Sequence, residues 1–182
     1  TIDENDFAGL LHHLKYIWIR DRFNVSFNED NLLTYYNKNK HFMYWGGSKK
    51  KGFDGKPSGD MRHEILKQIK KDEELSTWFV GNYDGFKADG KWNKKFHELV
   101  PTLMTARSTL CFNWPGYDAY LTSRYNEAMA CGIVPLVWKN YDCNNILVQS
   151  DWQRCWSYSD VKNKILQLSD GYFYKKTYTE IH

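Results

Sequence analysis

The chain has 182 residues, with 25 lysines and arginines against 22 aspartates and glutamates, so its formal net charge is +3. This length suits one domain with a sizeable core, and 42% hydrophobic and 17% aromatic residues exclude a disordered chain. No apolar run approaches the roughly 18–20 residues that a membrane-spanning helix needs, so no membrane partner is expected.

Residues 1–40 form a polar lead-in that carries short apolar stretches at helical spacing. We interpret it as a segment packed on the main domain or as the remnant of an upstream domain. The main domain is expected over residues 41–182. Four cysteines without a C-x-x-C pair argue against a metal site, and the polar start shows no secretory signal, so a cytoplasmic protein is expected.

From residue 41 onward, short apolar runs alternate with segments of helical spacing. The runs predict strands over residues 41–45, 76–80, 108–113, 133–138 and 153–158. Helices are expected over residues 60–71, 92–105 with a restart near Pro101, and 123–131, and Asp160 is expected to cap a final helix. This alternation predicts an α/β fold with a doubly wound parallel sheet, in which Pro135 inside a strand is the one discordant residue.

Ligands of such sheets bind at the carboxyl ends of the strands, where this sequence places three loops. The first loop contains Gly46, Gly47, Ser48, Lys49 and Lys51, which suit either a phosphate ligand or a solvated basic turn. The second loop follows the next strand.

In that second loop, Asn82 and Tyr83 follow Gly81. The loop either contacts a ligand or forms a plain turn, and both interpretations stay open. The third loop leads into the helix at 123–131. Thr122 or Ser123 can cap this helix, Arg124 offers a forked donor to a diphosphate, and Glu127 lies on nearly the same face. The alternative is that Arg124 and Glu127 only pair with each other.

The string from Glu127 to Pro135 reads Glu-Ala-Met-Ala-Cys-Gly-Ile-Val-Pro. It resembles a motif in the carboxyl-terminal, nucleotide-sugar-binding domain of GT-B glycosyltransferases. Arg124 three residues before the glutamate is similar to the spore-maturation branch of these enzymes. The stretch from Glu127 to Lys139 and the glycine turn at Trp45 also resemble DNA α-glucosyltransferases of T-even phages.

The resemblance implies a Rossmann-like half of a GT-B fold and an enzyme that transfers a sugar from a nucleotide diphosphate sugar, expected to be a UDP-sugar. Arg124 and Glu127 would be its catalytic residues, with Glu127 on the ribose hydroxyls and Arg124 on the leaving diphosphate. Gly46, Gly47, Ser48 and the lysines would lie near the donor phosphates, and Asn82 and Tyr83 near the base. No metal and no separate cofactor is implied.

The expected partners are the donor and an amino-terminal acceptor domain that this chain is too short to contain, with modified phage DNA as a possible acceptor. One departure from the family is Ala119, which stands where many of these enzymes have a second glutamate. A non-catalytic nucleotide- or partner-binding module of the same fold is therefore the alternative.

The last residues alternate aromatic side chains with lysines, from Tyr172 to Tyr178. Two interpretations stay open, namely contact with nucleic acid and an amphipathic segment that packs back on the domain.

Overall fold

The computed structural model describes residues 38–46, 61–83, 85–91, 96–113, 122–148 and 150–181, together with the single positions 14, 17 and 21. The helices and strands follow in chain order as β1 (Lys40–Trp45), α3 (Met61–Lys71), β2 (Thr77–Val80), α4 (Phe96–Leu103), β3 (Ala106–Cys111), α5 (Arg124–Ala130), β4 (Val134–Trp138), a 3-10 turn η2 (Asp151–Gln153), β5 (Arg154–Cys155), α6 (Tyr158–Ser169) and α7 (Gly171–Ile181). Among the described residues, none of the helices has the length and apolarity to cross a membrane.

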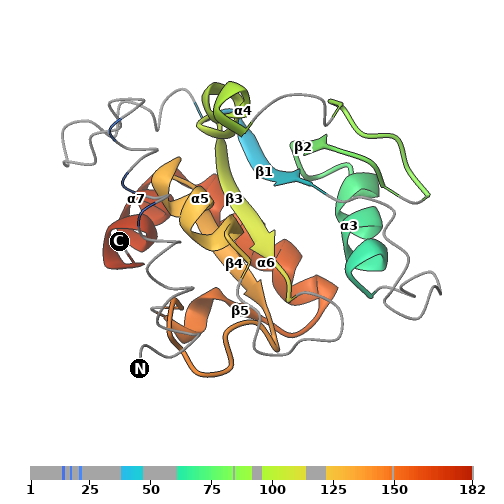
Figure 1. The fold of residues 1–182 in the computed structure, drawn as a ribbon. Coiled ribbons are helices and arrows are strands. Elements are labelled where there is room, and N and C mark those ends of the chain that lie inside the picture. Colours follow the sequence, from blue (N-terminus) through green and yellow to red (C-terminus); the bar gives the residue numbers. More distant parts are fainter. Residues whose placement is uncertain are drawn as a thin grey trace, which may run out of the picture.

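The strands form one five-stranded parallel sheet in the order β2-β1-β3-β4-β5, with helices on both faces (Figure 1). This confirms the predicted doubly wound α/β fold. The chain runs outward from β1 to β2 and then returns past β1 to β3. The strand order therefore reverses between β1 and β3, which is the position where sheets of this kind hold their ligands.

Alternating side chains of each strand point to opposite faces of the sheet and give the domain two core clusters. Phe42 and Tyr44 of β1 belong to the cluster with α3 and α6, whereas Met43 and Trp45 belong to the cluster with α4 and α5. All four side chains are at most 1% exposed, as expected for an apolar strand that lies inside the sheet between β2 and β3.

Helix α5 packs closely on the sheet because small residues line it. Ala128 and Ala130 are fully buried in the second core cluster, as expected for alanines that bring a helix near a strand. The amide of Ile133 donates to Ala128 and the amide of Gly132 donates to Met129, which closes the helix with the paired bonds of a Schellman motif. The predicted end of this helix at Gly132 is thus confirmed.

Pro135 causes no break in β4, although proline lacks a backbone donor. Its carbonyl points toward the β5 side, where the side-chain amide of Gln153 donates to it at 2.8 Å. The position that lacks an N–H at Pro135 faces that same side. The pairing of β4 with β5 begins only at Val137, two residues further along β4. The proline therefore removes no ladder bond, because no backbone acceptor of β5 faces this position.

Three expectations about individual elements were wrong, and one helix was not predicted. Strand β5 is only two residues long, because Ser157 caps α6 shortly after it. The Ser157 hydroxyl accepts from the amide of Asp160, so Ser157 and not Asp160 is the capping residue. Helix α4 ends at Leu103 and runs through Pro101 without a restart, at the loss of one backbone donor. Residues 171–181, predicted only as an alternating tail, form helix α7.

Helix α7 settles the two interpretations of the tail in favour of packing. Tyr174 and Tyr178 are at most 2% exposed, and their hydroxyls donate to the carbonyls of Gly132 and Met129 at the end of α5. Neither ring is therefore available to stack on a base. Among the aromatic side chains of α7, Tyr172 is the exposed one, at 80%.

Candidate functional site

The carboxyl end of β1 and the start of α5 meet at the strand-order reversal, and Arg124 links them. The Arg124 guanidinium lies 4.2 Å from the centre of the Tyr44 ring and 5.3 Å from that of Trp45. One terminal nitrogen donates to the Tyr44 hydroxyl at 3.0 Å, and the other donates to the backbone carbonyl of Trp45. Arg124 is thus held over the end of β1 by a ring, a hydroxyl and a carbonyl, all of them neutral.

Glu127 is held by the same strand end. Its side chain is almost wholly buried, since the residue is 6% exposed. One carboxylate oxygen accepts from the Trp45 indole at 2.8 Å and the other accepts from the Ser123 hydroxyl at 2.7 Å. A buried carboxylate needs such donors, and the bond from Trp45 fixes the orientation of Glu127.

The ion pairs among the described residues do not include one between Arg124 and Glu127. The alternative that these two residues only pair with each other is therefore wrong. Instead, Trp45 orients both, one through its carbonyl and the other through its indole. Burial by itself would lower the pKa of Arg124, but Tyr44, Cys111 and Glu127 outweigh it and hold that pKa above its usual value, so the guanidinium stays charged.

Two of the predicted glycines bring the loops close to one another. Gly46 has φ +85°, and a Cβ there would lie 2.9 Å from a terminal nitrogen of Arg124. Gly81 has φ +138°, and a Cβ there would lie 2.8 Å from the carbonyl oxygen of Gly46. Side chains at either position would force these three segments apart. The amide of Gly46 is itself occupied, because it donates to Val80 at 3.0 Å.

Ser123 is the N-cap residue of α5, but its side chain does not cap the helix. The expectation of a capping hydroxyl was wrong for Ser123, because the charged carboxylate of Glu127 one turn on is the stronger acceptor. Thr122 does not cap either. Its hydroxyl oxygen is covered and has no hydrogen-bond partner in the described structure, while its carbonyl accepts from Tyr141 at 3.0 Å.

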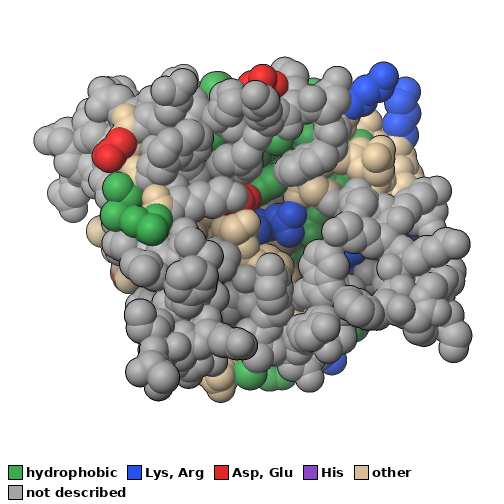
Figure 2. Space-filling model, in the orientation of Figure 1, with side chains coloured by type: hydrophobic (Ala, Val, Ile, Leu, Met, Phe, Trp, Pro, Cys, Tyr) green, Lys and Arg blue, Asp and Glu red, His purple; other side chains and the backbone are tan. Residues whose placement is uncertain are grey.

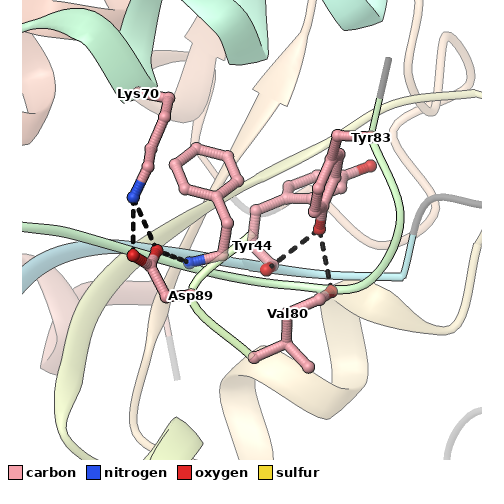
Figure 3. Close-up of polar contacts among 6 residues, drawn as sticks. Tyr44, Lys70, Val80, Tyr83 and Asp89 are labelled. Atoms are coloured by element: carbon pink, nitrogen blue, oxygen red, sulfur yellow. Dashed lines mark hydrogen bonds and ion pairs between the residues drawn. The ribbon is translucent and has the colours of Figure 1, made fainter. Parts of the chain in front are cut away.

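Asn82 and Tyr83 follow β2 but face different ways. Asn82 is exposed, whereas Tyr83 is 6% exposed and its hydroxyl donates to the carbonyls of Val80 and Tyr44 (Figure 3). Burial raises the pKa of Tyr83 well above its usual value. Tyr83 thus fastens β1 to the loop after β2, and Asn82 is the residue that this loop presents to solvent.

The edge of the sheet beside this loop is closed by the chain itself. The Asp89 carboxylate accepts from the amide of Phe79 at 2.8 Å and pairs with Lys70 at 2.7 Å (Figure 3). Gly90 lies beside Val80 as an isolated bridge. β2 therefore presents no open edge along this stretch.

The remaining predicted residues, Gly47, Ser48, Lys49 and Lys51, lie outside the described residues, as does Ala119. In Figure 2, basic side-chain atoms show near the middle of the viewed face, next to hydrophobic ones. Among the residues that the structure describes, no three His, Cys, Asp or Glu side chains gather in a way that could hold a metal ion.

Comparison with solved structures finds one match of informative quality. It is the DNA-modifying enzyme β-glucosyltransferase, whose structure was determined in the presence and absence of the substrate uridine diphosphoglucose. The TM-score is 0.61 at 18% identity, and the match covers 80% of this chain and 45% of that one. The chain thus spans less than half of that structure. No protein-family model and no curated protein matches the sequence.

At this identity the likeness concerns the fold alone. The chain has a glycosyltransferase-like fold, and its parallel sheet with helices on both faces is the Rossmann-like half that the sequence predicts.

Sequence reasoning missed two residues of this arrangement. Tyr44 was assigned only to an apolar strand and Trp45 to the strand end and the glycine turn, yet they hold Arg124 and Glu127. The one signal was their position as the last two residues before the glycine turn.

Proposed function

We propose that this chain is the donor-binding half of a glycosyltransferase that transfers a sugar from a nucleotide diphosphate sugar. The observation that carries the proposal is the shared anchoring of Arg124 and Glu127 by Trp45 at the reversal of strand order. This anchoring places a charged hydrogen-bond donor and a carboxylate acceptor together at the edge where such sheets bind ligands. The glycosyltransferase-like fold is the second support.

Arg124 would bind the diphosphate. Its charge, its forked donors and its stacking on Tyr44 provide an orientation that needs little reorganisation when the ligand arrives. As the bond between sugar and diphosphate breaks, negative charge grows on the leaving phosphate. A fixed guanidinium would stabilise this charge more in the transition state than in the ground state.

Glu127 would accept hydrogen bonds from the ribose hydroxyls. The Trp45 indole holds one carboxylate oxygen in place, whereas the Ser123 hydroxyl on the other can rotate away when a ligand hydroxyl replaces it. The lysines of the first loop, Lys49 and Lys51, would lie nearer the phosphates with Gly47 and Ser48. Asn82 would contact the base, and Tyr83 would support the loop from below.

The acceptor in this proposal is a modified base in DNA, bound with the help of a second domain. The support is that the matched enzyme is described as DNA-modifying and that this chain covers only 45% of it. A non-catalytic module of the same fold would keep donor binding and lack transfer.

Calorimetry with UDP-glucose and UDP as probes tests the donor site. Glu127→Gln and Arg124→Lys should each weaken binding about tenfold or more, because each removes a charge-assisted or forked contact. Glu180→Gln on α7, whose side chain is 62% exposed, is the matched control and should bind like wild type. The proposal fails if the protein binds neither probe, or if both variants bind as well as wild type.

Incubation with UDP-[14C]glucose and hydroxymethylated DNA then tests the reaction. Label on the DNA supports the proposed acceptor, and label on another acceptor rejects it. Donor binding without transfer or hydrolysis would favour the non-catalytic module.

A further inference from the structure

Four aromatic side chains cross the sheet near the carboxyl ends of its strands. We call them the aromatic row: Tyr83 after β2, Tyr44 in β1, Phe112 after β3 and Trp138 in β4. Successive ring centres lie 6.0, 6.2 and 5.9 Å apart, in the same order as the strands. The row passes through the strand-order reversal, where Arg124 lies over its second member.

The polar atoms of the row are paired except at one end. The Tyr83 hydroxyl donates to two carbonyls, and the Tyr44 hydroxyl accepts from Arg124. Trp138 is 6% exposed, and its indole Nε1 is buried without a hydrogen-bond partner in the described structure. Most buried polar groups in native proteins are paired because an unpaired one costs folding free energy. Trp138 lies two rings along the row from Tyr44, over which Arg124 lies, so the row has an unpaired donor at its Trp138 end.

A second unpaired group belongs to the same edge. The covered hydroxyl of Thr122 has no partner in the described structure. Tyr141 connects the two positions, because its amide donates to the Trp138 carbonyl at 2.7 Å and its hydroxyl donates to the Thr122 carbonyl at 3.0 Å. Burial raises the pKa of Tyr141 well above its usual value, so this phenol stays protonated and keeps the connection.

The two groups are chemically unlike Arg124. An indole N–H only donates, a threonine hydroxyl donates and accepts, and neither carries charge. Together they suit the neutral hydroxyl groups of a sugar. A phosphate would instead be attracted to the guanidinium.

We propose that Trp138 Nε1 and Thr122 Oγ1 form a sugar-selecting subsite beside the diphosphate position at Arg124. This inference rests on the proposed function and adds the part of the donor that these residues recognise. In it, Arg124 and Glu127 bind the nucleotide portion that all donors share. Trp138 and Thr122 bind the part in which donors differ.

The test uses two changes, each of which removes one polar group. Trp138→Phe keeps an aromatic ring and removes the N–H, and Thr122→Val keeps the shape and removes the hydroxyl. Calorimetry gives the ratio of the UDP dissociation constant to that of UDP-glucose for each variant. Trp156→Phe is the matched control, because Trp156 follows the neighbouring strand β5 and is 64% exposed.

Each subsite variant should bind UDP-glucose about three- to tenfold more weakly while its affinity for UDP stays unchanged. Thr122→Val should also raise the melting temperature of the free protein, since it removes an unpaired buried hydroxyl. Trp156→Phe should leave the ratio as in wild type. Stability and affinity changing in opposite directions is the signature of a polar group kept for a ligand.

The inference is overturned if UDP and UDP-glucose affinities fall together or if the ratio stays at the wild-type value in both variants. The second result would mean that Trp138 Nε1 and Thr122 Oγ1 bind a buried water or have a role in the fold alone. If wild type binds neither probe, the proposed function fails as well, so the two failures are distinguishable.

Discussion

The indole of Trp45 should account for a measurable part of the stability of this domain. Trp45→Phe removes the 2.8 Å bond to Glu127 and leaves a carboxylate that is 6% exposed with one donor fewer. A hydrogen bond to a buried charged group contributes about 1.5–3 kcal/mol, and the smaller ring adds about 1 kcal/mol for the space it leaves. We therefore expect Trp45→Phe to lower the free energy of unfolding by about 2–4 kcal/mol.

A double-mutant cycle separates the bond from the change of ring size. Denaturant unfolding of wild type, Trp45→Phe, Glu127→Gln and the double variant should give a coupling energy of about 1–2 kcal/mol. Trp78→Phe is the matched control, since Trp78 packs on the same core cluster and its indole meets no carboxylate among the described residues. Its change should add to that of Glu127→Gln. A coupling between Trp45 and Glu127 below about 0.5 kcal/mol would refute the reasoning.

Three further outcomes follow from the described geometry. Gly46→Ala should cost about 1–2 kcal/mol of stability, measured by denaturant unfolding, and should weaken UDP binding, because φ is +85° and the new Cβ would meet Arg124. Burial lowers the pKa of Lys38 to about 7 from 10.5, so between these values the unfolded chain binds a proton that the native chain lacks. The free energy of unfolding should then rise with pH in this range, by at most about 1.4 kcal/mol per pH unit. The measurement is the difference in free energy of unfolding between wild type and Lys38→Met. This comparison is needed because the buried thiols of both proteins change the stability with pH in the opposite direction. Ellman's reagent should modify Cys143 rapidly and the three buried cysteines only in denaturant; two or more rapid thiols in the native protein would contradict this.

Most of the fold could be predicted because each element has a local signal. β1, β2 and β4 lie within a residue of their expected bounds, since each is a short apolar run that ends in a turn. Helix α7 was missed because the alternation of aromatic residues with lysines was weighed before its helical spacing. Tyr174, Thr177, Tyr178 and Ile181 are spaced by three, one and three residues and share the buried face of that helix.

Of the candidate site, the pair of residues on α5 was predictable from the sequence, whereas the contacts that hold the pair were not. Arg124 and Glu127 are separated by three positions, so their common face follows from helix geometry alone. The partners that hold them lie about 80 positions away in the sequence, at the end of another strand. Only the packing of α5 across β3 and β4 brings these segments together, and no local pattern contains that information.

The way in which the two groups are held decides what the site can do. Had Arg124 and Glu127 paired with each other, each would have cancelled the other's charge, and a diphosphate would have had to break that pair. Trp45 instead supplies a neutral acceptor to one and a neutral donor to the other, so both charges are oriented without being cancelled. The Glu127 charge still acts on Arg124, because it helps to hold the pKa of the guanidinium above its usual value. In the proposed function, a ligand would bring a negative diphosphate to the guanidinium and hydroxyl donors to the carboxylate, and these contacts would stabilise the native state. A saturating nucleotide sugar should therefore stabilise wild type more than it stabilises Trp45→Phe, whose carboxylate is no longer oriented.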